Sequence, residues 1–199
     1  MAKPSLVYPD ACIFINVIKK EAGLWGESLK VLLAAERGDI RLAASTFLLA
    51  ELNGWKGDVD QAERDDTVGR FLEGVNTTWS EVDFLTVRVA TDLSERYHLR
   101  GADAVHLATA IRLGCDYFMT RDTDFPRGTE IDGVKIRRPS IVWDPTVDDV
   151  LVDSEADAEV EQQDKQPARA ASRISAEGKR LIARKKPLAL EPGTSEPTT

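Results

Sequence analysis

Four acidic residues stand beside apolar runs at the ends of predicted strands and helices. They are Asp10, Glu51, Asp103 and Asp122, with Asp124 close to the last. Carboxylates gathered in a folded domain have one common stable use, which is to bind hard divalent cations such as Mg²⁺ or Mn²⁺ through oxygen ligands. Without a cation, the negative charges repel one another, and some of the groups are forced to protonate. The acidic set therefore predicts a metal-dependent phosphodiesterase.

Two of these acids follow predicted strands directly. Residues 6–8 form a short predicted strand that ends at Asp10, and the strand predicted at 115–120 is followed by Asp122. In open α/β sheets, the loops after parallel strands converge at the carboxyl ends of the strands, where ligands bind. We therefore expect both carboxylates at the same edge of a sheet.

Glu51 and Asp103 would reach that edge from helices. Glu51 lies inside the helix that is predicted to begin at Ser45 and Thr46. Asp103 begins another helix, where a negative charge also suits the N-terminal dipole. Judged alone, Asp103 is equally a helix cap and Asp122 an ordinary turn residue. Four carboxylates from four separate segments favour one common site.

The rest of the chain alternates helical and strand patterns. This alternation predicts an α/β fold in which helices cover both faces of a mostly parallel sheet. The other predicted helices cover 11–18, 26–37, 60–75, 85–97 and 102–113, and the other predicted strands cover 40–44 and 135–143, with 79–83 ambiguous.

Composition indicates one domain with an appendage. The chain has 199 residues, of which 42% are hydrophobic, and this is enough for an ordinary core. The net charge of −8 argues against a protein that binds nucleic acid with its whole surface. The sequence becomes acidic over 148–164 and basic over 165–186. We therefore predict a domain at 1–145 and a charged, largely disordered tail at 146–199.

The two cysteines, Cys12 and Cys115, lack the paired spacing of a disulfide framework or a zinc site. The first residues lack the long apolar stretch of a signal peptide, and no segment approaches a membrane-spanning length. We expect a cytoplasmic protein that has no membrane partner.

Four pieces of the sequence, in this order, resemble the PIN-domain nucleases. The resemblance covers residues 5 to 143 and implies a three-layer α/β/α sandwich. The pieces are Val7-Tyr8-Pro9-Asp10-Ala11-Cys12, Ser45-Thr46 with Ala50-Glu51, Asp103-Ala104-Val105-His106-Leu107-Ala108-Thr109-Ala110, and Thr120-Arg121-Asp122-Thr123-Asp124-Phe125.

The resemblance also implies roles for single residues. The metal-binding acids would be Asp10, Glu51, Asp103 and Asp122, with one or two Mg²⁺ or Mn²⁺ ions, and Asp124 would be an auxiliary ligand. Ser45 and Thr120 would hydrogen-bond a carboxylate or a metal-bound water. His106 would pack and donate a hydrogen bond near the site, because metal ions already activate water.

Small bacterial members of this family are often VapC-like toxins of toxin–antitoxin pairs that cut RNA. The resemblance therefore implies an endoribonuclease with an RNA substrate, a cognate antitoxin and a tendency to form homodimers. Its products would carry a 5′-phosphate and a 3′-hydroxyl. Pro9 and the long tail depart from the usual small toxin. A non-toxin RNA-processing nuclease and a module that binds RNA or a partner protein without cutting are the alternatives.

Overall fold

The computed structural model describes residues 3–55, 61–74 and 77–164. Within them, strands and helices alternate along the chain. The strands are β1 (Leu6–Pro9), β2 (Arg41–Ser45), β3 (Thr77–Ser80), β4 (Tyr117–Met119), β5 (Glu130–Ile131) and β6 (Val134–Arg137). The helices are α1 (Ala11–Ile18), α2 (Trp25–Arg37), α3 (Thr46–Gly54), α4 (Gln61–Thr67), the π-helical segment η1 (Val68–Leu72), α5 (Phe84–Tyr97), α6 (Gly101–Arg112) and α7 (Val147–Asp164).

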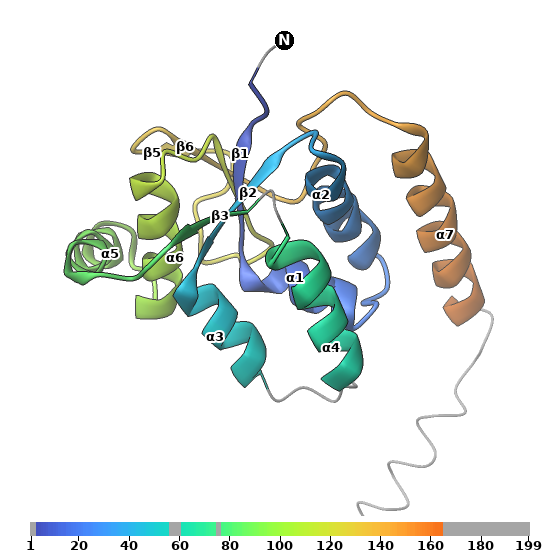
Figure 1. Ribbon diagram of the computed structural model, residues 1–199, viewed down its shortest axis with the longest axis horizontal. Helices are drawn as coiled ribbons and strands as arrows, with labels where there is room; N and C mark the ends of the chain where they lie inside the picture. The colour runs from blue at the N-terminus through green and yellow to red at the C-terminus, as the bar shows by residue number, and fades with distance from the viewer. Residues whose placement is uncertain (1–2, 56–60, 75–76, 165–199) are drawn as a thin grey trace, which may run out of the picture. The chain divides into compact units, whose positions relative to one another are not determined.

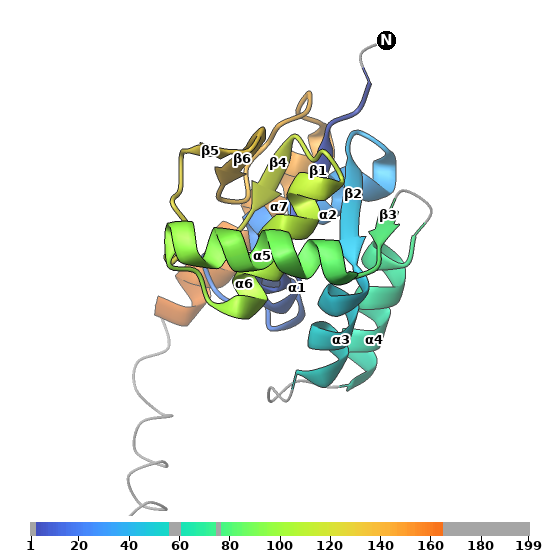
Figure 2. The same cartoon turned by 90° about the vertical axis from the view of Figure 1, so that its left-hand side faces the viewer.

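A six-stranded sheet in the order β3-β2-β1-β4-β6-β5 separates two helical layers. All neighbouring strands are parallel except β5 and β6. Helices α5 and α6 cover one face of the sheet, while α1 and α2 cover the other (Figures 1 and 2). The predicted three-layer α/β/α sandwich with a mostly parallel sheet is confirmed. None of the helices in the described ranges is both long enough and apolar enough to span a bilayer.

Strand β1 lies in the middle of the sheet. Leu6, Val7 and Tyr8 are all buried, as expected for a parallel strand that is covered on both faces. Beyond the end of β1, the Asp10 amide donates to the Met119 carbonyl over 2.9 Å and so continues the pairing of β1 with β4. The backbone of Asp10 is therefore fixed against the end of β4.

The last part of the sheet differs from the sequence prediction. Residues 135–143 were expected as a last strand interrupted by Pro139, and β6 ends at Arg137, before that proline. The strand β5 that pairs with it was not expected. A hairpin joins β5 to β6 through Asp132 and Gly133, which have φ angles of 47° and 87°. A two-residue hairpin turn of this type requires positive φ at both positions, which is why Asp-Gly is common there. The Asp-Gly pair is visible in the sequence.

The helix predicted at 60–75 is also divided. In the described part, α4 ends at Thr67 and η1 follows over Val68–Leu72. Val68, Phe71 and Leu72 are buried, whereas α4 contributes no buried residue. The ambiguous region before α5 contains β3, whose residues 77–80 pair with β2.

The structure corrects the expected disorder of the tail for residues 147–164, which form helix α7. Thr146 and Asp149 start this helix, because the Thr146 amide donates to Asp149 Oδ2 over 2.8 Å. This bond corresponds to half of a capping box. Trp143 Nε1 donates to the same oxygen over 3.1 Å, and Asp149 is 2% exposed.

Contacts with α2 hold the first part of α7 on the domain. Arg37 Nη2 lies 3.2 Å from Asp149 Oδ1, and Lys30 pairs with Asp153. Val152 is buried as well. The acidic segment therefore neutralises two cations of α2, which is why it is helical although it has few large apolar groups.

The chain divides into two compact units, Met1–Val160 and Glu161–Thr199. Only the end of α7 is described in the second unit. The basic segment at 165–186 lies outside the described residues, and the functional domain boundary at residue 145 stays a prediction.

Gly26 is the point where α2 and α7 approach most tightly among the described glycines, and we predict that Gly26→Ala displaces α7. A Cβ at Gly26 would lie 2.9 Å from the Ala156 Cβ, and neither atom belongs to a flexible side chain. Gly69→Ala is the matched control, because a Cβ there meets nothing within 4 Å. We expect Gly26→Ala to be less stable than the control by about 1–3 kcal/mol in urea denaturation. Equal stabilities, with unchanged hydrogen exchange over 147–156, would contradict this packing.

Candidate metal centre

Asp10 is the most tightly held of the predicted acids. It is the N-cap of α1, where its Oδ1 accepts a hydrogen bond from the Ala11 amide over 2.7 Å. Its Oδ2 accepts from Thr120 Oγ1 over 2.7 Å and from Cys12 Sγ over 3.3 Å. Only 8% of Asp10 is exposed. The Ala11 amide at the start of α1 and the side chain of Thr120 therefore fix both oxygens.

Asp103, Asp122 and Asp124 form a second group next to it. One carboxylate oxygen from each lies within 4.8 Å of the others. Asp103 stands in the first turn of α6, and the other two belong to the loop after β4. The loop is shaped by hydrogen bonds from the Asp122 amide to Thr120 Oγ1, over 3.0 Å, and from the Asp124 amide to Asp122 Oδ1, over 2.8 Å. Thr120 therefore links Asp10 to this loop.

Among these acids, Asp103 has the least favourable environment for a negative charge. Its Oδ2 is buried and has no hydrogen-bond partner. Burial raises the pKa of Asp103 above its ordinary range, and the negative charges of Asp122 and Asp10 raise the pKa further. A buried carboxylate oxygen without a donor, surrounded by like charges, is unfavourable unless a proton or a cation neutralises it. The residues present therefore fit a divalent cation with oxygen ligands.

Glu51 does not belong to the three-aspartate group. Its Oε2 lies 2.8 Å from Nε2 of His106, whose Nδ1 lies 2.9 Å from the Tyr8 hydroxyl. The Tyr8 hydroxyl in turn lies 2.9 Å from Ser45 Oγ. Ser45 also caps α3 by accepting from the Leu48 amide over 3.0 Å, so it contacts Tyr8 where a carboxylate partner was expected.

The tautomer of His106 sets the direction of these hydrogen bonds. Where Nε2 carries the proton and Nδ1 does not, Nε2 donates to the Glu51 carboxylate and Nδ1 accepts. The Tyr8 hydroxyl then donates to Nδ1 and accepts from Ser45. Burial raises the pKa of Tyr8, which keeps the phenol protonated. The chain therefore positions one Glu51 oxygen through buried donors.

Tyr8 and Cys12 are the residues at this site that sequence reasoning missed. Tyr8 reads as one more β-former in an apolar strand, and no sequence pattern distinguishes it. The arginines flanking the acids differ in their partners. Arg121 Nη2 lies 2.5 Å from Glu27 Oε2 of α2, whereas Arg100 Nε lies 3.7 Å from Asp124 Oδ2 and is largely exposed.

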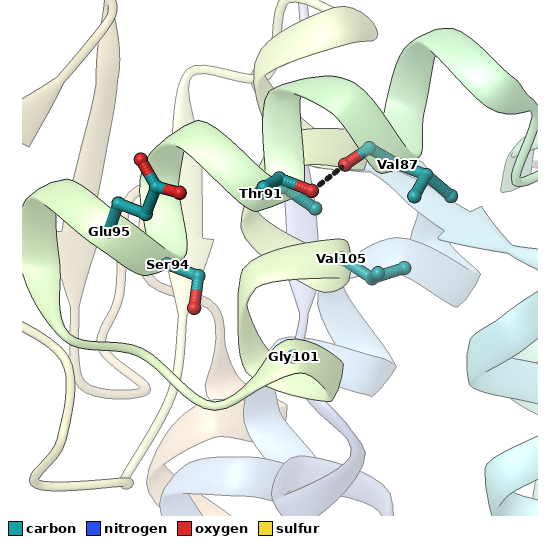
Figure 3. A pocket seen from close by; sticks show the side chains of 7 residues that line it. Val87, Thr91, Ser94, Glu95, Gly101 and Val105 are labelled. Atoms are coloured by element: carbon teal, nitrogen blue, oxygen red, sulfur yellow. Dashed lines mark hydrogen bonds between the residues drawn. The ribbon is translucent and has the colours of Figure 1, made fainter.

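A separate groove of about 370 Å³ lies between α5 and α6 (Figure 3). Figure 3 shows that its polar side chains are small apart from one carboxylate. The lining residues are Val87, Ala90, Thr91, Ser94, Glu95, Gly101 and Val105. With a single charged group, this groove lacks the ligand set of a metal centre.

A protein-family model, that of the PIN domain, matches residues 7–130. The chain belongs to the PIN-domain family. No curated protein matches the chain.

Among solved structures, this PIN-domain chain is similar to the following three. VapBC2 from Rickettsia felis bound to a DNA fragment from the promoter is 16% identical, with a TM-score of 0.49, over 70% of this chain and 99% of the other. A toxin–antitoxin complex from Klebsiella pneumoniae is 21% identical, with a TM-score of 0.45, over 65% and 94%. FitAcB from Neisseria gonorrhoeae is 14% identical, with a TM-score of 0.44, over 67% and 97%.

We predict that Mn²⁺ stabilises the wild type more than it stabilises Asp103→Asn. A cation present at about a hundredfold its dissociation constant should raise the wild-type Tm by about 5–10 °C.

Without a cation, Asp103 should make the stability depend on pH, because its pKa is raised in the folded protein. Its contribution to the free energy of unfolding is complete below about pH 3.9 and is lost as the pH rises through the pKa of the folded state. Asp103→Asn should therefore melt higher than the wild type at pH 7 in EDTA. Calorimetry of both proteins at pH 7, in EDTA and in Mn²⁺, measures the two differences in Tm. Equal Mn²⁺ shifts in the two proteins would count against a cation at Asp103.

We further predict that Tyr8→Phe destabilises the protein by about 1–3 kcal/mol, because it leaves buried His106 Nδ1 without a donor. Tyr97→Phe is the control, since among the described residues its hydroxyl has a hydrogen bond only from an exposed Arg96 nitrogen, at 3.2 Å. Urea denaturation of both variants gives the comparison. Similar losses in the two variants would show that the Tyr8 hydroxyl adds nothing beyond a surface contact.

Proposed function

We propose that this PIN-domain protein is an endoribonuclease that depends on Mg²⁺ or Mn²⁺ and hydrolyses RNA phosphodiester bonds. The observation that carries the proposal is the buried, unpartnered Asp103 Oδ2 among further carboxylates at one edge of the sheet. Repelling charges of this kind have no structural benefit by themselves. A module that binds RNA without cutting has no need of them.

The metal ligands in this proposal are Asp10, Asp103 and Asp122, with Asp124 as an auxiliary ligand. Glu51 is the remaining ligand, and because His106 already contacts its Oε2, Glu51 would contribute Oε1. Thr120 supports the set by donating to Asp10 and accepting from the loop after β4. Divalent cations held there would activate a water molecule and offset the charge that develops on the phosphate.

The side chains of the protein would orient the ligands and the substrate, while the cations supply the activation of water. Asp10 keeps one orientation during substrate binding because both of its oxygens accept hydrogen bonds. His106 is not a general base in this mechanism, since both ring nitrogens are engaged and 1% of the residue is exposed. The side chain of Arg100 is 80% exposed, and it would turn from Asp124 toward the scissile phosphate.

Two features support a protein partner, and we propose that it is a cognate antitoxin. The sequence resembles VapC-like toxins, and α5 exposes an apolar patch made of Phe84, Leu85 and Val87, with exposed fractions of 75%, 58% and 46%. Apolar side chains gathered on a surface mark an interaction site more often than isolated ones do. The same patch is where we expect a homodimer. A small antitoxin frame beside the coding region would favour the toxin over a non-toxin RNA-processing nuclease.

The test is cleavage of a mixed RNA pool with Mn²⁺, Mg²⁺ or EDTA. We expect metal-dependent cleavage that leaves 5′-phosphate ends and falls at least about a hundredfold in Asp10→Asn and Asp103→Asn, which lose a ligand charge. Asp92→Asn is the control for charge, because Asp92 is an exposed residue of α5 whose ion pair is with Arg96. A folded wild-type protein that binds RNA but does not cut it with either metal would overturn the proposal in favour of a binding module.

A further inference from the structure

A second cavity, of about 440 Å³, has a basic lining. It is formed by residues just before β5, by the end of β6 and by the residues that follow β6. The lining residues are Arg127, Gly128, Ile136, Arg137, Arg138 and Ser140. We refer to this cavity as the arginine cleft, because three of its six lining residues are arginines.

The arginine cleft lies at the same edge of the sheet as the acids. Strands β1, β4 and β6 are parallel, so their carboxyl ends point the same way. The Thr120 amide donates to the Arg137 carbonyl over 2.8 Å, and the Thr120 hydroxyl donates to Asp10. One residue therefore contacts both regions. Two strand spacings separate β6 from β1, which is roughly 10 Å.

The charge of the cleft is not neutralised by the rest of the described chain. Arg127, Arg137 and Arg138 are exposed, and none of them forms an ion pair with a carboxylate in the described ranges. Most arginines elsewhere in these ranges do have acidic partners, in a protein whose net charge is −8. The paired arginines are Arg37, Arg64, Arg70, Arg96, Arg100, Arg112 and Arg121.

Arg137 is also partly positioned before any ligand arrives. Its guanidinium carbon lies 5.4 Å from the centre of the Tyr117 ring, and Lys135 lies over the same ring at 5.8 Å. Stacking on an aromatic ring restricts the guanidinium and leaves its N–H donors available. A planar set of such donors is suited to two oxygens of one phosphate.

We propose that the arginine cleft binds the phosphodiester backbone of the RNA substrate at a position beside the scissile bond. This inference rests on the proposed nuclease function, which supplies the anionic polymer. Cations held by the acids would bind the reacting phosphate, and the arginines bind a neighbouring phosphate directly. An acidic segment of a partner protein is the competing ligand, but the position of the cleft beside the acids favours RNA.

The experiment measures binding of a fluorescent single-stranded RNA to the full chain in EDTA, over a range of salt concentrations. We expect Arg127→Gln and Arg138→Gln each to weaken binding about tenfold and to reduce the salt slope by about 0.7. Arg88→Gln is the matched control, because Arg88 is an exposed arginine of α5 that has no acidic partner in the described ranges. The basic segment at 165–186 is the same in every variant.

Steady-state cleavage in Mn²⁺ gives a second measurement. The cleft variants should raise KM and leave kcat nearly unchanged, because the cleft contacts a part of the RNA that does not react. If Arg127→Gln and Arg138→Gln bind RNA as Arg88→Gln does, with the same salt slope, the proposal is overturned. Normal RNA binding combined with lost binding of a poly-glutamate probe would overturn it too, in favour of an acidic protein ligand.

The two proposals can fail separately. If the wild type cuts RNA and the cleft variants cut it with the same KM, the cleft proposal is wrong and the nuclease proposal stands. If the wild type does not cut with either metal but binds RNA through Arg127 and Arg138, the nuclease proposal is wrong and the cleft stands as an RNA-binding site.

Discussion

Repulsion among carboxylates at the carboxyl edge of the sheet is the constraint on which this structure depends. Asp103, Asp122 and Asp124 bring their oxygens within 4.8 Å of one another, and Asp103 Oδ2 is buried without a donor. Flexible segments would separate such charges. Here the backbone prevents separation, because the acids follow parallel strands or open a helix that packs on the sheet. A rigid parallel sheet thus holds the charges together, and in the proposed function a cation would relieve the repulsion without a rearrangement.

Neutral donors around the acids determine which oxygens remain available. Thr120 serves Asp10 and the loop after β4 at once, and the chain from Ser45 through Tyr8 and His106 reaches Glu51. These groups are buried and satisfied, so they add order without adding charge. The same arrangement explains why a histidine beside the acids is not available as a base. Its Nε2 already contacts the Glu51 carboxylate, and its Nδ1 contacts the Tyr8 hydroxyl.

The distribution of charge explains how an acidic chain can bind an anionic polymer. Cations at the acids would supply positive charge at the reacting phosphate, and the arginine cleft supplies positive charge next to it. Most of the other arginines in the described ranges pair with acidic groups within the protein, and Lys30 and Arg37 do so with α7. Within the described ranges, the three cleft arginines therefore place unpaired positive charge at this edge of the sheet.

The sequence by itself determined the fold class, the order of most elements and the residues that are candidates for the site. These depend on local patterns, namely apolar runs, helix starts and acids directly after strands, which are visible along the chain. The tertiary structure alone decided that Glu51 pairs with His106, that Tyr8 joins the site and that α7 is a helix on α2. It also placed Arg127 and Arg138 in one cleft. Each of these depends on contacts between residues far apart in sequence, whose energies come from burial and charge pairing that no local pattern records.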